Sequence, residues 1–149
     1  MVVRRCAGLL ALAACIGACG AANAPWPGDA VESYESALAE GNYASACGLF
    51  DSGARGSLES AMGRHASCTN VLSRCVPYRP AIAKQDQSQL LYANVLVHTH
   101  GRKAEVSISG TAVSKEIHEV SLRKEHGRWK LTSYGRQVTG CVGKRRRAA

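Results

Sequence analysis

The chain has 149 residues, a formal net charge of +8, and only one Phe and five Tyr. About 120 residues remain once an N-terminal leader is set aside, which suffices for one domain and not for two. A nucleic-acid-binding surface needs basic residues interleaved with aromatic ones on one face. The scarcity of aromatic residues therefore excludes that class, and we expect no nucleic-acid partner.

The first eighteen residues follow an export pattern. Arg4 and Arg5 are the only charged residues before Asp29, and residues 6–18 are apolar and uncharged. This apolar run has the length of a signal-peptide core and is shorter than the roughly 20 residues that a membrane-spanning helix needs. Residues 1–18 are therefore predicted to be a signal peptide, and the protein to be exported.

The sequence IGAC at residues 16–19 ends this segment. It resembles the lipobox of bacterial lipoproteins, which has a branched apolar residue, two small residues and a cysteine. The resemblance implies that the thiol of Cys19 receives a diacylglyceryl group and that Cys19 becomes the mature N-terminus. The sequence LAAC at residues 12–15 makes Cys15 the alternative, with a shorter apolar run before it. The expected location is the outer face of the bacterial cell membrane.

Ordinary signal-peptide cleavage is the alternative to lipidation, and it would release a secreted protein. The sequence ANA at residues 22–24 is a suitable site, but Pro25 would follow the cut. Proline lacks the N–H group and the flexibility of an ordinary scissile peptide, so we favour the lipid anchor. Residues 19–28 are small and contain two prolines, which predicts a lipidated tether between membrane and domain.

Four cysteines remain outside the leader and the lipidation site: Cys47, Cys68, Cys75 and Cys141. In an oxidising compartment they predict two disulfides, for which three connectivities exist. If Cys68 and Cys75 share a helix, they lie about 10 Å apart, beyond the roughly 7 Å limit for a disulfide. We predict Cys47–Cys68 and Cys75–Cys141, with the crossed pairing as the alternative. The spacings do not match a zinc site, so no metal is expected.

Residues 29–75 carry helical signals. Asp29 and Glu32 have the spacing of a capping box, Gly41 predicts a helix stop, and Asn42 predicts the N-cap of a second helix. Gly63 is expected to interrupt a third helical region. The predicted helices span residues 30–40, 43–50 and 57–75, with a break at Asp51-Ser52-Gly53 after the second.

The apolar period changes from helical to two after residue 90, which predicts strands over 91–98, 104–109, 117–124 and 129–134. Gly101 and His126-Gly127 are the predicted turns. Helices followed by antiparallel strands indicate an α+β domain over residues 29–142, with the helices packed on one face of a sheet of about four strands. Residues 143–149 are predicted to be a basic disordered tail, with weak attraction to anionic lipid headgroups as the alternative.

Two segments carry a resemblance to a known fold family. Residues 31–50 (VESYESALAEGNYASACGLF) and 120–131 (VSLRKEHGRWKL) resemble the nuclear transport factor 2-like superfamily, specifically its small exported bacterial members. The resemblance implies a cone-shaped fold with a curved sheet around the first helix, and often a pocket at the wide end. It implies little about function, because members include isomerases, dehydratases and proteins with no known activity.

Candidate catalytic side chains are few. Tyr92 and His98 lie on the first predicted strand, His100 continues the same alternation beyond residue 98, and His118 is expected on a solvated face. Two histidines beside the turn at Gly101 are typical of a surface, and no poised carboxylate pair or Gly-x-Ser-x-Gly motif is present. We therefore assign no catalytic residue or cofactor. The favoured function is a non-catalytic binding or interaction module for a small apolar ligand or an envelope protein. The alternative is a pocket enzyme of isomerase or dehydratase type using His98 or His100 with Tyr92.

Overall fold

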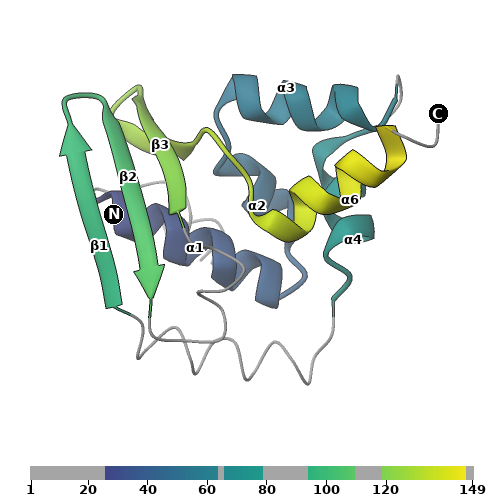
Figure 1. The fold of residues 1–149 in the computed structure, drawn as a ribbon, viewed down its shortest axis with the longest axis horizontal. Coiled ribbons are helices and arrows are strands. Elements are labelled where there is room, and N and C mark those ends of the chain that lie inside the picture. Colours follow the sequence, from purple (N-terminus) through teal and green to yellow (C-terminus); the bar gives the residue numbers. More distant parts are fainter. Residues whose placement is uncertain (1–25, 64–65, 79–93, 110–118, 147–149) are drawn as a thin grey trace, which may run out of the picture.

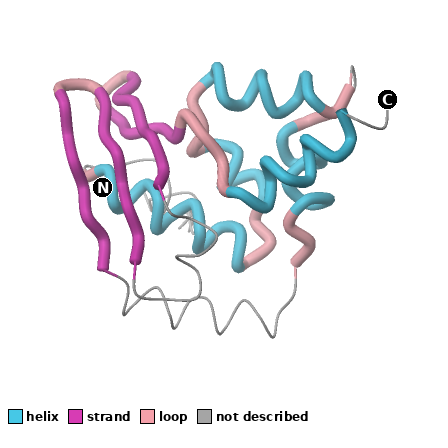
Figure 2. Tube along the Cα trace, in the orientation of Figure 1, coloured by secondary structure: helices cyan, strands magenta, loops and turns pink. Residues whose placement is uncertain are grey.

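The computed structural model describes residues 26–63, 66–78, 94–109 and 119–146. The predicted signal peptide, Cys15, Cys19, Tyr92 and His118 lie outside the described residues. Helices come first and an antiparallel sheet follows, so the predicted α+β class is confirmed, while the cone shape stays a prediction (Figures 1 and 2). The elements are α1 Pro27–Ala39, α2 Tyr43–Gly48, α3 Ser52–Ala61, α4 Cys68–Cys75, β1 Asn94–His100, β2 Lys103–Ser109, β3 Glu119–Glu125, β4 Arg128–Leu131 and α6 Arg136–Arg146.

Helix α1 begins earlier than predicted. Its N-cap is Trp26, no side chain caps it, and Asp29 lies within the first turn, so the predicted capping box with Glu32 is wrong. The physical reason is Pro27, whose fixed φ suits the first helical position and which has no N–H group to satisfy. A Cβ atom at Gly28 would collide with the Trp26 ring. Residues 27 and 28 therefore belong to the domain, not to the tether.

Helices α1 and α2 are joined as the sequence predicted. Gly41 has a φ of 69°, the left-handed conformation that ends many helices. The side chain of Asn42 then caps α2 by accepting a hydrogen bond from the amide of Ser45 at 3.2 Å. Helix α2 ends at Gly48, two residues before the predicted end at Phe50.

Helix α3 begins where the sequence predicted only a break. The carboxylate of Asp51 accepts a hydrogen bond from the amide of Ala54 at 2.6 Å and so caps the helix. Asp is among the best N-cap residues, which is why α3 starts at Ser52 and not at residue 57. The predicted interruption near Gly63 is present, since Gly63 has a φ of 105°. Helix α4 follows, capped by the hydroxyl of Ser67.

The sheet is a simple meander in the order β1-β2-β3-β4, with each strand antiparallel to the next. Helix α1 packs against β1, β2 and β4. His126 and Gly127 both have positive φ, 49° and 80°, and form a two-residue turn between β3 and β4, as expected for a type I′ hairpin. The period-two prediction holds for the side chains that β2, β3 and β4 bury on the inner face: Ala104, Val106, Ile108, Val120, Leu122, Trp129 and Leu131.

Helix α6 corrects the prediction of a disordered tail over residues 143–149, because the helix continues to Arg146. Its sequence, with two glycines and three β-branched residues, has low helix propensity. Tertiary contacts hold it instead. Val138 and Val142 are buried, Cys141 is bonded to Cys75, and the side-chain amide of Gln137 donates through Nε2 to the carbonyl oxygen of Cys75 at 3.0 Å.

Candidate functional site

The two edges of the sheet differ. Strand β4 is covered by the chain itself, since the Asp51 amide donates to the Leu131 carbonyl at 2.9 Å and the Leu131 amide donates to the Leu49 carbonyl at 2.8 Å. Strand β1 pairs with β2 alone among the strands that the structure describes. Within that part of the chain, the sheet therefore has one closed edge and one open edge, and the open edge is β1 (Figure 1).

Strand β1 has apolar side chains on both faces. Val95 and Val97 are in register with the buried Ile108 and Val106, so they continue the inner face of the sheet, while Leu96 lies on the outer face. Leu96 is 60% exposed and Val95 is 39% exposed. The strand, NVLVHTH, contains no Lys, Glu or Pro. Natural edge strands use such residues to prevent pairing with other chains, so β1 is unprotected by its sequence.

The structure places His98 and His100 on the outer face of β1, where both are exposed. His98 is in register with Glu105, and His100 with Lys103. The two histidines therefore share a face, as predicted, and they face solvent. They do not meet inside a concave site, and Tyr92 lies outside the described residues, so nothing here supports the pocket enzyme. Among the side chains that are described, no group of three His, Cys, Asp or Glu residues is placed to hold a metal ion.

A polar cluster lies at the closed edge. The carboxylate of Asp51 is buried. Its Oδ1 accepts a hydrogen bond from the Ala54 amide, and its Oδ2 forms an ion pair with the guanidinium of Arg123 at 2.5 Å. Arg123 also contacts Glu125 at 3.2 Å. Both oxygens of Asp51 are thus engaged within the protein, and the cluster has the character of a structural joint between α3 and the sheet.

Lys130 forms a second link at this edge. Its ammonium group donates to the carbonyl oxygen of Gly48, at the end of α2. Partial burial lowers the pKa of Lys130, and the nearby positive charge of Arg128 lowers it further. A cation at a helix C-terminus also interacts favourably with the helix dipole. Lys130 therefore attaches α2 to the sheet.

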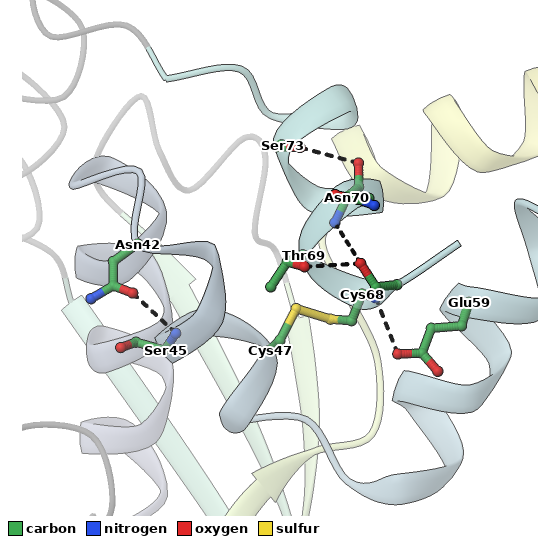
Figure 3. The surroundings of a disulfide bond; sticks show 9 residues. Asn42, Ser45, Cys47, Glu59, Cys68, Thr69, Asn70 and Ser73 are labelled. Atoms are coloured by element: carbon green, nitrogen blue, oxygen red, sulfur yellow. Dashed lines mark hydrogen bonds between the residues drawn. A yellow bond between two sulfur atoms is a disulfide. The ribbon is translucent and has the colours of Figure 1, made fainter. Parts of the chain in front are cut away.

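Two disulfides connect the helices in series. Cys47 of α2 is bonded to Cys68 of α4, and Cys75 of α4 is bonded to Cys141 of α6. These are the two pairs that the sequence predicted. Figure 3 shows the first pair, beside which the Glu59 carboxylate accepts a hydrogen bond from the Cys68 amide at 3.1 Å. The helical layer is thus cross-linked on the side away from β1.

The hydroxyl of Tyr34 is the one buried side-chain polar atom in the described part of the chain with no hydrogen-bond partner. Its ring packs against that of Phe50, with ring centroids 5.3 Å apart. Burial raises the pKa of Tyr34 far above its ordinary value, and the charge of Glu35 adds to the shift. The phenol therefore stays protonated in the core, where it is 3% exposed.

Comparison with known proteins adds no assignment, since no family model, curated protein or solved structure matches the chain. Of the helices in the described ranges, none is long and apolar enough to cross a membrane.

The open strand β1 is the candidate functional site. Sequence reasoning placed a strand here but started it at residue 91 and did not recognise it as an edge.

Proposed function

We propose that the protein is an exported lipoprotein, held on the outer face of the bacterial cell membrane by a lipid on Cys19, with a non-catalytic interaction domain. We further propose that this domain binds an extended segment of another envelope protein along β1. The observation that carries the binding proposal is the open edge at β1, opposite an edge that the chain itself closes. Two disulfides support export, because disulfides persist in oxidising compartments.

The resemblance to the nuclear transport factor 2-like superfamily belongs to the same proposal. Helix α1 packs on a four-stranded antiparallel meander, which agrees with the expected arrangement of first helix and sheet. Fold likeness of this kind says little about activity. The functional proposal therefore depends on β1 and not on the resemblance.

Strand addition explains what β1 offers to a partner. An added strand forms main-chain hydrogen bonds that supply affinity, while alternate side chains supply specificity. Its inward side chains would lie beside Val95 and Val97, and its outward ones beside Leu96, His98 and His100. The best-matched segment is apolar beside residues 95–97 and carries carboxylates beside the two histidines.

Mass spectrometry of the protein purified from its host tests the lipid anchor. The proposal expects a chain that begins at Cys19, carries a diacylglyceryl group and is lighter by four hydrogen atoms because of its two disulfides. A chain that begins at Pro25 without lipid would refute the anchor. A chain that begins at Cys15 would move the lipid to the alternative site.

Site-specific photo-crosslinking in the host tests the binding proposal. The probe replaces Leu96 in one variant and Ser121 in the control, which is also exposed on the outer face but lies on the interior strand β3. The cross-linked peptide is sequenced, synthesised and added to the purified protein. We expect this peptide to slow amide hydrogen exchange along β1.

A pair of matched substitutions sharpens this test. Leu96→Lys adds an ammonium group at the edge and should weaken peptide binding at least about tenfold, since a charge on an edge strand opposes pairing. Ser121→Lys adds the same charge away from the edge and should leave binding unchanged. Equal cross-linking at both positions, or slowed exchange only in the helices, would contradict the proposal. Cross-links from Leu96 to a second copy of the chain would replace the envelope partner with self-association.

A further inference from the structure

Charge is separated along the chain. Residues 26–61 contain six carboxylates and one Arg, a net charge of −5. Residues 94–109 and 119–146 together contain ten Lys and Arg and three Glu, a net charge of +7. The first group forms α1, α2 and α3, and the second forms the sheet and α6. The domain therefore has an acidic helical part and a basic part built on the sheet.

The basic side chains gather at the tips of the two hairpins. The guanidinium of Arg102, in the β1–β2 turn, donates to the carbonyl oxygen of Lys124 through Nε at 3.2 Å and Nη2 at 2.9 Å. The amide of Lys124 donates in return to the carbonyl of Arg102 at 2.8 Å. Because these bonds tie the two tips together, their charges form one surface.

The outer face of the sheet continues this surface. His100, Lys103, Arg123 and Lys130 occupy successive strands in direct register, and directly opposed residues share a face. In Figure 1 both hairpin tips and the C-terminal end of α6 lie toward the upper side of the molecule, while α1 lies below. The strongly basic segments thus lie toward the same side of the molecule in this view.

Internal contacts neutralise only part of this charge. Arg123 is paired with Asp51 and Glu125, and Lys130 donates to Gly48. Among the described residues, no other Lys or Arg side chain forms an ion pair with a described carboxylate. Eight cations of the basic part lie outside these two contacts. We define the basic rim as five of them, which are exposed except for the partly buried Lys124: Arg102, Lys103, Lys124 and Arg128 at the hairpin tips, and Lys144 near the C-terminal end of α6.

We propose that the basic rim lies against the phosphate groups of an anionic lipid bilayer. A basic surface is attracted to such a bilayer by about 1 kcal/mol for each Lys or Arg near it. The acidic side chains of α1 and its C-cap, with Glu32 and the C-cap Glu40 exposed, are repelled, so the charge separation orients the domain. The rim does not belong to the β1 edge, and this inference goes beyond the proposed peptide binding.

The lipid anchor of the proposed function strengthens the contact. Trp26 is only seven positions after Cys19, and seven residues span about 25 Å at full extension. A lipid on Cys19 therefore holds the domain within reach of the bilayer surface. The attraction of the rim to phosphate does not require this lipid, so it is testable without it.

Vesicle co-sedimentation of unlipidated residues 26–149 is the experiment. This segment contains all the described elements, both disulfides and the whole described core, so it folds without the leader. We expect binding to vesicles that contain phosphatidylglycerol, weakening as salt is added, and no binding to pure phosphatidylcholine. Lys103→Gln with Arg128→Gln should weaken binding about thirtyfold, from the loss of two cations.

The matched control is Arg74→Gln with Arg136→Gln, which removes two exposed cations on α4 and α6 outside the rim. It should change binding less than about threefold, since these charges lie off the contact surface. Equal weakening by both pairs, or no binding to anionic vesicles, overturns the proposal, as does binding to soluble polyphosphate with none to vesicles. Leu96→Lys should retain vesicle binding, so failure of the edge proposal and failure of this one are distinguishable.

Discussion

Arg123 of β3 lies opposite Lys130 of β4 and extends to Asp51, which caps helix α3, with 2.5 Å between Nη2 and Oδ2. Asp51 and Arg123 are 72 positions apart in the chain. Asp51 is 3% exposed, whereas the Arg123 side chain is 46% exposed. One buried carboxylate therefore serves as a helix cap and as an anchor between the helices and the sheet.

Asp51→Ala should lower the free energy of unfolding by about 3 kcal/mol, because it removes an N-cap and a partly buried ion pair. Asp51→Asn keeps a capping oxygen and should cost less, about 1 kcal/mol. The control Glu125→Gln removes the other carboxylate on Arg123 and should change stability by less than about 0.5 kcal/mol, as for a surface pair. Urea denaturation measures all three. A cost for Glu125→Gln equal to that of Asp51→Ala would contradict the structural role of Asp51.

Removal of either disulfide should destabilise the protein, and by different amounts. The Cys75–Cys141 bond closes a loop with a sequence separation of 66, against 21 for Cys47–Cys68. Loop-closure entropy therefore predicts losses of about 4 and about 3 kcal/mol for the paired Cys→Ala variants. Loss of the Cys75–Cys141 bond should also speed amide hydrogen exchange in α6, whose helix propensity is low. A reversed order of stability, or unchanged exchange in α6, would contradict this account.

Two tyrosines should respond oppositely to loss of their hydroxyls. Tyr34→Phe removes a buried hydroxyl without a partner, so the free energy of unfolding should stay unchanged or rise by up to about 1 kcal/mol. Tyr43→Phe removes a hydrogen bond from the hydroxyl to the carbonyl oxygen of Val76, 2.8 Å long, and should cost about 1 kcal/mol. Thermal and urea unfolding measure both. A large loss in Tyr34→Phe would show that its hydroxyl has a partner.

The β3–β4 turn offers a stabilising substitution. His126 has a φ of 49°, a left-handed conformation that Asn adopts more readily than most residues. His126→Asn should therefore raise the free energy of unfolding by about 0.5 kcal/mol. Gly127→Ala, where φ is 80°, should lower it by about 1 kcal/mol. Stabilisation by both substitutions would rule out the type I′ geometry.

Local signals in the sequence predicted much of the fold. The alternation of Ala104, Val106 and Ile108 identified a buried strand face, and Asn42 marked a helix start that the structure contains. Each signal lies within a window of a few residues, over which backbone geometry alone determines the side-chain period. The capping box at Asp29 failed because Pro27, two residues earlier, starts the helix.

The candidate site was less accessible to sequence reasoning. The apolar pattern at residues 95–97 predicts a strand, but such a pattern does not distinguish an edge strand from an interior strand of the sheet. Edge character depends on which segments pair, and here residues 49–51 close the β4 edge from a distance of about eighty positions along the chain. His98 and His100 were expected on a surface, and the pairing with β2 places them there.

By itself the sequence determined the α+β class and the inward faces of β2, β3 and β4, and it excluded a bond between Cys68 and Cys75, because short-range periodicity and helix geometry constrain each of these. Only the tertiary structure decided which of the two remaining cysteine pairings forms, that β1 pairs on one side alone among the described strands, that Asp51 meets Arg123, and that residues 136–146 form a helix. These features join segments far apart in the chain. Their stability comes from contacts formed after long loops close, and no local pattern of residues encodes which contacts those are.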